Sequence, residues 1–425
     1  MTASEQLAQF AAGSKALPKL CREYKKERAT VHLKELVGGA LSFYAAAAVA
    51  KTGGVHIFVA EDRDAAAYLL NDFYNLLDEK QVYFFPSSYK RSAAYGAEDA
   101  QGVVQRTTAM NAVRGFTKGY LVVCTYPEAL AERVVDAATL QRDTIAVKLG
   151  DKISIAVLED ALADANFTRV DFVYEPGQYS VRGGIVDVFS YSESKPYRID
   201  FFGDEVDSIR RFNISSQLSA DKLDRVEIVP NLNAGEAPRV SFVQFAGSSA
   251  TCWFYDADYV LRRVNDLRRK VLADMEEPGQ IDRLLTSRNV LLRDMAGNSV
   301  VALRDNLPER PATAAVVFDT APQPKFNKNF EMLADDMIRN SLRGYATYIL
   351  SENKVQVERL ENIFHQIGRG QAAVRSLSVT LHEGFVDNDL KLCLYTDHQI
   401  FDRYQRYRIN GEIRRDEQMT VAELN

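Results

Sequence analysis

The sequence has little of what secreted, redox-active or metal-binding proteins need. Its 425 residues include four cysteines, Cys21, Cys124, Cys252 and Cys393, each more than a hundred positions from the next. The close pairs that zinc sites and redox motifs use are therefore missing. The five histidines also do not pair at helical or HxH spacing. We expect buried, reduced cysteines and no metal site.

Long apolar runs are missing as well. No stretch approaches the roughly 18 consecutive apolar residues of a membrane span, and the first residues lack the charged start and apolar centre of a secretion signal. With 46% hydrophobic residues the chain can still bury a substantial core, and its length favours about two to four domains. We expect a cytoplasmic protein with no membrane partner.

The chain also lacks an excess of positive charge. Its formal net charge is −6, which argues against a surface that binds nucleic acid throughout. Long basic side chains usually form a solvated helix face, so DNA binding with steep salt dependence remains a secondary hypothesis. The segments that would carry it are Arg262, Arg263, Arg268, Arg269 and Lys270 on one predicted helix, and Arg403–Arg415, where arginines alternate with tyrosines.

The first third of the chain alternates short apolar strands with helices of three- and four-residue apolar spacing, which predicts a parallel sheet. Asp62 and Asp64 are expected helix N-caps. The predicted strands are Thr30–Glu35, Val55–Ala60, Val82–Phe85 and Tyr120–Thr125. The predicted helices are Ser42–Lys51, Asp64–Leu77, Ala100–Arg114 and Pro127–Asp136.

The pattern changes at about Thr144, where closely spaced strands with period-two alternation and glycine turns run to Phe212. This predicts a small antiparallel module inserted into the first unit. Beyond it we expect a long charged helix and a return to α/β structure. The elements predicted there are the helices Ala257–Met275 and Lys354–Ile367 and the strands Ala346–Leu350, Ser376–Leu381 and Leu390–Tyr395.

A glycine loop follows the first strand and precedes an alanine-rich helix, which is the order in which nucleotide phosphates are bound. The residues do not suit that chemistry. A working loop places lysine and a hydroxyl residue at GxxxxGK[ST], whereas Leu41 stands at the lysine position and Ser42 follows it. The favoured interpretation is that Gly38 and Gly39 form a tight turn, and the alternative is a relic of an ancestral nucleotide fold. We expect no hydrolysis and no cofactor.

A strand from Tyr197 to Phe202 has an unusual outer face. Alternation places Tyr197, Ile199 and Phe201 toward a core and Arg198, Asp200 and Phe202 on the other side, next to a probable turn at Gly203-Asp204. An exposed aromatic residue beside arginine is typical of a binding hot spot. In the alternative, both faces are buried, Phe202 meets a neighbouring domain and Arg198 pairs with an acidic group across the sheet.

Two motifs carry a family resemblance: EPGQYSVRGGIVDVF at 175–189 and YRIDFFGDEVDSIR at 197–210. They resemble the UvrB-homology module shared by the excision-repair protein UvrB and the transcription-repair coupling factor Mfd. The degenerate phosphate loop favours the coupling-factor branch, since UvrB keeps an intact loop. The stretch Phe84–Ala109 also looks too short for the DNA-clamping hairpin of UvrB.

The resemblance implies a fold and its domains. The fold class is α/β: a degenerate P-loop, helicase-like parallel sheet (1–132 and 213–315), an inserted, mostly antiparallel α+β module that binds UvrA (133–212), and a further small α/β domain (316–425). The chain looks like an amino-terminal fragment that stops before the polymerase-binding and motor domains of the family. RNA polymerase and DNA would then be bound largely through other regions.

The resemblance also implies a function. Such a chain is a non-catalytic module that recruits UvrA to stalled RNA polymerase in nucleotide excision repair, through Arg182, Arg198 and Phe202. In the family, carboxyl-terminal domains cover this face when the protein is idle, so a fragment without them should bind UvrA constitutively. The alternative function is an enzyme, an ATP-dependent DNA translocase or a UvrB-like DNA-binding helicase.

Overall fold

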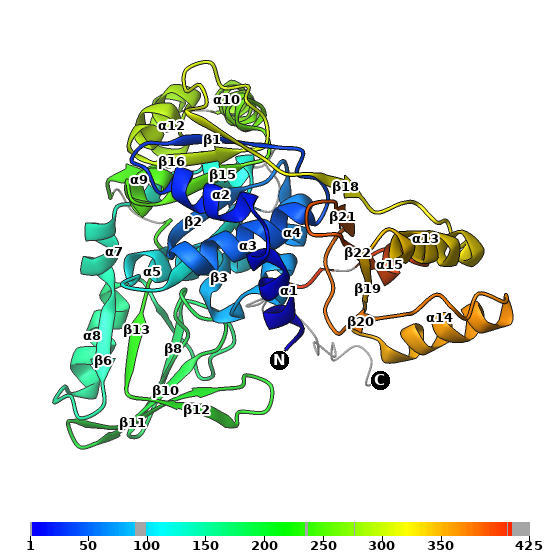
Figure 1. Cartoon of the computed structure of the whole chain (residues 1–425). Coiled ribbons are helices and arrows are strands. Elements are labelled where there is room, and N and C mark those ends of the chain that lie inside the picture. Colours follow the sequence, from blue (N-terminus) through cyan, green and yellow to red (C-terminus); the bar gives the residue numbers. More distant parts are fainter. Residues whose placement is uncertain (1, 90–98, 234–236, 276, 406, 410–425) are drawn as a thin grey trace.

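A computed structural model describes residues 2–89, 99–233, 237–275, 277–405 and 407–409. Three units are visible, a central α/β unit, an antiparallel unit below it and a smaller α/β unit at its side (Figure 1). The expected mixed α/β fold, with one large parallel sheet and further antiparallel sheets, is confirmed. All four cysteines are buried and free, as the sequence predicts.

The central unit contains a seven-stranded parallel sheet built from two separate stretches of chain. Across the sheet the order is β17 (Ala314–Val317), β1 (Thr30–Lys34), β16 (Ser299–Ala302), β15 (Thr251–Phe254), β2 (Gly54–Val59), β4 (Tyr120–Thr125) and β3 (Val82–Phe84). These short runs of Val, Ile, Phe and Cys are nearly all buried, as expected for a parallel sheet covered on both faces.

Helices before and after these strands cover the sheet. One group packs together as α1 (Ala3–Ala12), α2 (Ala16–Tyr24), α3 (Ala40–Thr52) and α4 (Arg63–Leu76). The others are α5 (Ala100–Arg114), α6 (Pro127–Ala131), α9 (Phe242–Ala246), α10 (Ala257–Asp274), α11 (Ile281–Leu284) and α12 (Arg288–Asp294), with 3-10 turns at Glu79–Gln81, Pro278–Gln280 and Met295–Gly297. Asp62 caps α4 by accepting from the Ala65 amide, whereas Asp64 lies in the first turn and is not the cap.

The antiparallel unit has a six-stranded sheet and a two-stranded ribbon. The sheet order is β12 (Ser219–Leu223), β11 (Glu205–Phe212), β10 (Tyr197–Phe202), β9 (Ile185–Val188), β8 (Gln178–Arg182) and β7 (Thr168–Arg169). The ribbon pairs β6 (Ile145–Lys148) with β13 (Arg225–Ile228), and α8 (Ile155–Asp164) packs on the inner face. The antiparallel unit therefore continues past Phe212, where we placed the end of the inserted module, because β12 of the sheet and β13 of the ribbon follow that residue.

The chain enters and leaves this unit through a second ribbon, in which β5 (Val134–Val135) pairs with β14 (Arg239–Val240). A separate helix, α7 (Ala137–Asp143), follows β5. The predicted helix Pro127–Asp136 is thus wrong beyond Ala131. It ends there because the Glu132 carboxylate accepts hydrogen bonds from Ser88 and the Arg133 amide bonds to the Leu284 carbonyl.

The third unit holds a five-stranded mixed sheet with the order β18 (Thr320–Pro322), β21 (Phe385–Asp387), β22 (Leu392–Thr396), β19 (Ala346–Leu350) and β20 (Ser376–Leu377). Its helices are α13 (Phe330–Leu342), α14 (Lys354–Gln366) and α15 (Asp397–Ile400). The predicted strand Ser376–Leu381 stops at Leu377, because the following residues leave the sheet and cross to the central unit. Leu381 and Phe385 consequently belong to the core of the central sheet.

Candidate partner-binding site

The outer face of the antiparallel sheet is lined by charged residues at alternating positions. Tyr179, Val186 and Ile199 face α8 and the buried core. On the opposite face, Ser180, Asp187, Arg198 and Arg210 lie in one row across β8 to β11, because each is the register partner of the next. Period-two alternation therefore places Asp187 directly across from Arg198.

Asp187 is the centre of this row and is 1% exposed. Its carboxylate accepts from Nε and from a terminal nitrogen of Arg198 at 2.7 and 2.9 Å, and from a terminal nitrogen of Arg182 at 2.5 Å. These charge-assisted bonds compensate for burying the carboxylate. The hydrogen bond to Asp187 raises the pKa of Arg198 above its ordinary value. The sequence analysis did not single out Asp187, because its place opposite Arg198 depends on the pairing of β9 with β10.

Arg198 is largely occupied within its own unit. Its guanidinium lies 4.4 Å from the centroid of the Phe212 ring and donates to the backbone and side-chain oxygens of Gln217 at 3.4 and 3.2 Å. Only 15% of its side chain is exposed, against 37% for Arg182. The alternative interpretation, in which Arg198 pairs with an acidic group across the sheet, therefore describes this residue correctly.

Phe202 has the opposite environment. It ends β10 and pairs with Glu205 across the two-residue turn Gly203-Asp204, where Gly203 has φ 63°, a left-handed conformation that glycine adopts without strain. Phe202 is 83% exposed. The prediction that its ring lies on the solvent-exposed outer face of the sheet is confirmed. The alternative, in which Phe202 packs against a neighbouring domain, is wrong for the described residues.

The degenerate phosphate loop is in contact with the backbone of the third unit. Gly38 has φ 57°, and Gly39 is the N-cap residue of α3. A Cβ atom on Gly39 would lie 2.1 Å from the carbonyl oxygen of Glu383, so the backbone of the third unit lies directly on the loop. Leu41 and Ser42 line the remaining pocket of about 290 Å³. The Glu383 carbonyl oxygen therefore leaves no room for a side chain at Gly39.

The Ser42 hydroxyl is hydrogen-bonded within the fold. Its hydroxyl donates to Asp72 at 2.6 Å, and the other oxygen of Asp72 accepts from the His382 amide at 2.6 Å. Burial raises the pKa of Asp72 to about 7. The carboxylate therefore connects the loop to the third unit.

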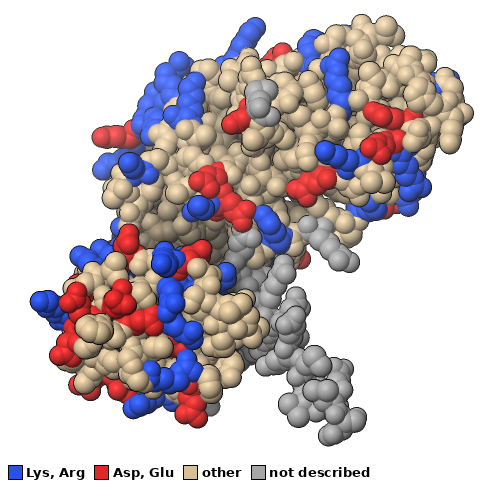
Figure 2. All heavy atoms as spheres, turned by 90° about the horizontal axis from the view of Figure 1, so that it is seen from below, with Lys and Arg blue, Asp and Glu red and all other residues tan. Residues whose placement is uncertain are grey.

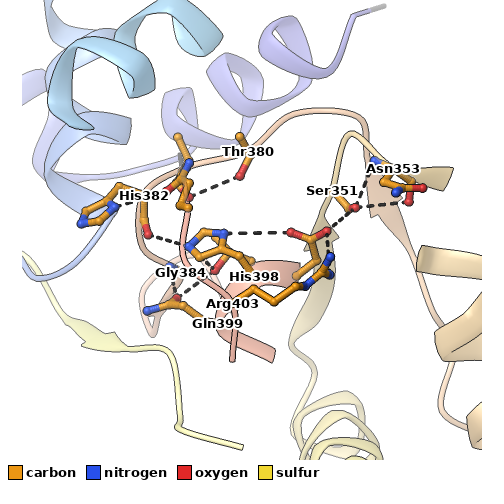
Figure 3. A network of polar contacts seen from close by, with 12 residues as sticks. Ser351, Asn353, Thr380, His382, Gly384, His398, Gln399 and Arg403 are labelled. Atoms are coloured by element: carbon orange, nitrogen blue, oxygen red, sulfur yellow. Dashed lines mark hydrogen bonds and ion pairs between the residues drawn. The ribbon is translucent and has the colours of Figure 1, made fainter. Parts of the chain in front are cut away.

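Residues 380–384, which we call the strap, are held by polar contacts on both sides (Figure 3). The His398 Nε2–H donates to the His382 carbonyl at 2.8 Å, and the Gly384 amide donates to the Gln399 side chain at 2.8 Å. From the central unit, Asn75 donates to the Thr380 carbonyl at 2.9 Å. The ring of His382 stacks on that of Tyr68 with centroids 3.7 Å apart. These contacts fix the strap on the loop.

The basic segments are interspersed with acids. On α10 the salt bridges are Arg262–Asp258, Arg263–Glu128, Arg268–Asp282 and Arg269–Asp266. On the lower-left part of the face seen in Figure 2, blue and red atoms lie close together among tan ones. The second segment, Arg403–Arg415, lies mostly outside the described residues. Within the described ranges, no three His, Cys, Asp or Glu side chains are grouped to hold a metal, and every helix is too short or too polar to span a bilayer.

Comparison with known proteins agrees with the motifs. Residues 145–233 match the UvrB interaction domain family. The chain is 27% identical over 199 residues to the transcription-repair-coupling factors of Bacillus subtilis and Escherichia coli, a match that covers 47% of this chain and 17% of each relative. It is 35% identical over 101 residues to that of Haemophilus influenzae, covering 24% of this chain and 9% of the relative. The resemblance stated from the motifs is thereby confirmed.

Proposed function

We propose that this chain is the UvrA-recruiting part of a transcription-repair coupling factor and works by binding rather than by catalysis. The observation that carries the proposal is Phe202, an aromatic side chain 83% exposed at a hairpin tip. It lies inside the stretch that matches the UvrB interaction domain family. Large exposed rings next to arginine are the usual anchors of protein interfaces.

The three proposed contact residues have different roles. Phe202 would fill an apolar pocket on UvrA, and Arg182 would bond an acidic group with the donors that Asp187 leaves unused. Arg198 would act mainly as a positioning residue, since it holds Asp187 and Gln217. In a longer protein, carboxyl-terminal domains would cover the same face. RNA polymerase and DNA would be bound largely by other regions.

A binding assay with purified UvrA tests the proposal. Phe202→Ala should weaken capture by more than tenfold, about 1.4 kcal/mol, without unfolding the chain. Leu342→Ala is the matched control, because Leu342 is 84% exposed but ends α13 in the third unit. Unchanged capture by the Phe202 variant, or equal loss by both variants, would refute the assignment.

The non-catalytic part of the proposal is supported by the strap. The Glu383 carbonyl lies on Gly39, and Asp72 and Glu383 add carboxyl groups to the pocket where a nucleotide phosphate would be expected. Both features oppose anion binding. Calorimetric titration with ATP and magnesium should give no heat of binding, and a saturable signal would favour the translocase alternative instead.

A further inference from the structure

A second exposed aromatic residue lies beside the proposed docking face. Phe172 belongs to the loop between β7 and β8 and is 49% exposed. The guanidinium carbon of Arg182 lies 4.8 Å from the centroid of its ring. Val173, the next residue, is buried, so the loop is anchored in the core while Phe172 remains on the surface. The ring is therefore held in place next to Arg182.

Arg182 separates this ring from the Phe202 hairpin. On β8 it pairs with Ile185 of β9, which pairs with Asp200 of β10, two residues before Phe202. The glycine turn after Arg182 also contacts β10 directly, since the Phe201 amide donates to the Gly184 carbonyl at 2.8 Å. Phe172, Arg182 and Phe202 thus follow one another across the same end of the sheet.

Arg182 is also able to bind a further acceptor. Among the described residues, Asp187 is its one hydrogen-bond acceptor, reached by a single terminal nitrogen. Guanidinium carries five donors in a planar fork that matches a carboxylate. An arginine with spare donors between two exposed rings presents the residue types that are enriched in interface hot spots.

We propose that the docking surface extends to Phe172, so that its partner offers one carboxylate to Arg182 between two apolar hollows, one for Phe202 and one for Phe172. The inference rests on the proposed function, because the partner in question is UvrA. It adds a contact outside the two motifs, on a loop whose position is fixed by the edge strand β7. Phe172 then both shields the guanidinium from water and contacts the partner.

The test is a set of single substitutions in the whole chain, each titrated against purified UvrA. Phe172→Ala should weaken binding by at least fivefold, and Phe172→Leu, which keeps apolar contact but not the ring, by less. Val157→Ala is the matched control, because Val157 is 56% exposed but lies on α8, behind the inner face of the sheet. It should leave binding unchanged.

The outcomes separate the two proposals. If Phe202→Ala loses binding while Phe172→Ala does not, the extension is wrong and the proposed function stands. If neither variant loses binding, both are wrong. Hydrogen exchange of β8 and β9 in the Phe172→Ala chain identifies loss through unfolding, and weakened binding accompanied by faster exchange there would overturn the extension. Weakened binding with unchanged exchange supports it.

Discussion

Replacing Arg198 by alanine tests whether this residue acts by contact with a partner or by holding its own unit together. The change removes two of the three guanidinium bonds that Asp187 accepts and leaves a carboxylate that is 1% exposed with Arg182 alone. At about 1.5 kcal/mol for each charge-assisted bond, the loss is about 3 kcal/mol, within the range for breaking a buried ion pair. Local opening should then rise by about a hundredfold.

Hydrogen exchange measured by mass spectrometry can resolve this effect. Exchange should accelerate in β8 to β11 and stay unchanged in the central sheet, where Trp253 stacks on Phe58 and its fluorescence gives an internal control. Adding Asp187→Asn to Arg198→Ala should recover part of the stability, since the unpaired charge is gone. Normal exchange in Arg198→Ala together with lost UvrA capture would refute the positioning role and show that Arg198 acts by direct contact.

Three further substitutions test the contacts between units. Burial raises the pKa of Asp72 to about 7, so the folded state binds a proton that the unfolded state releases. The free energy of unfolding should therefore fall by up to about 1.4 kcal/mol per unit as the pH rises from about 4 to 7. Asp72→Asn should flatten this slope in urea titrations, and an unchanged slope would show that another group causes it. Gly39→Ala should displace the strap, because the added Cβ would lie 2.1 Å from the Glu383 carbonyl oxygen. Proteolysis at the strap should then become faster, while ATP binding should remain absent. Tyr44→Phe removes a 2.5 Å bond to Asp387 and should cost about 1–3 kcal/mol, and an unaltered melting temperature would contradict that bond.

The sequence predicted the regular elements well where periodicity was strong. The strand Tyr120–Thr125 and the helix Ala100–Arg114 agree with the structure at both ends. The predicted elements that end early, Pro127–Asp136 and Ser376–Leu381, were cut short by contacts with residues far away in the chain. Such tertiary contacts leave no local periodicity, so pattern analysis could not detect them.

The candidate site also has residues that the sequence could predict and residues that it could not. Alternation placed Phe202 on the outer face, and its exposure agrees. The same alternation could not tell that Arg198 is engaged by Asp187 and Gln217, because pairing across a sheet depends on strand order and register. No sequence pattern pointed to Phe172, since nothing in its loop indicates which strand it will lie beside. The contact of the strap with the loop could likewise not be predicted from the sequence, because Glu383 and Gly39 are brought together only by the packing of two units.

The strand order of the central sheet has a consequence for how the chain folds during synthesis. Thr30 pairs with Val300 and Val31 with Ala314, so β1 has no neighbouring strand until β16 and β17 have left the ribosome. The antiparallel unit, in contrast, is made from one continuous stretch and can close early. Pairings of such long separation are slow to form, and unpaired strand edges aggregate. During synthesis the antiparallel unit can therefore be folded while β1 is still unpaired, and β1 is the strand for which protection by a chaperone would matter most.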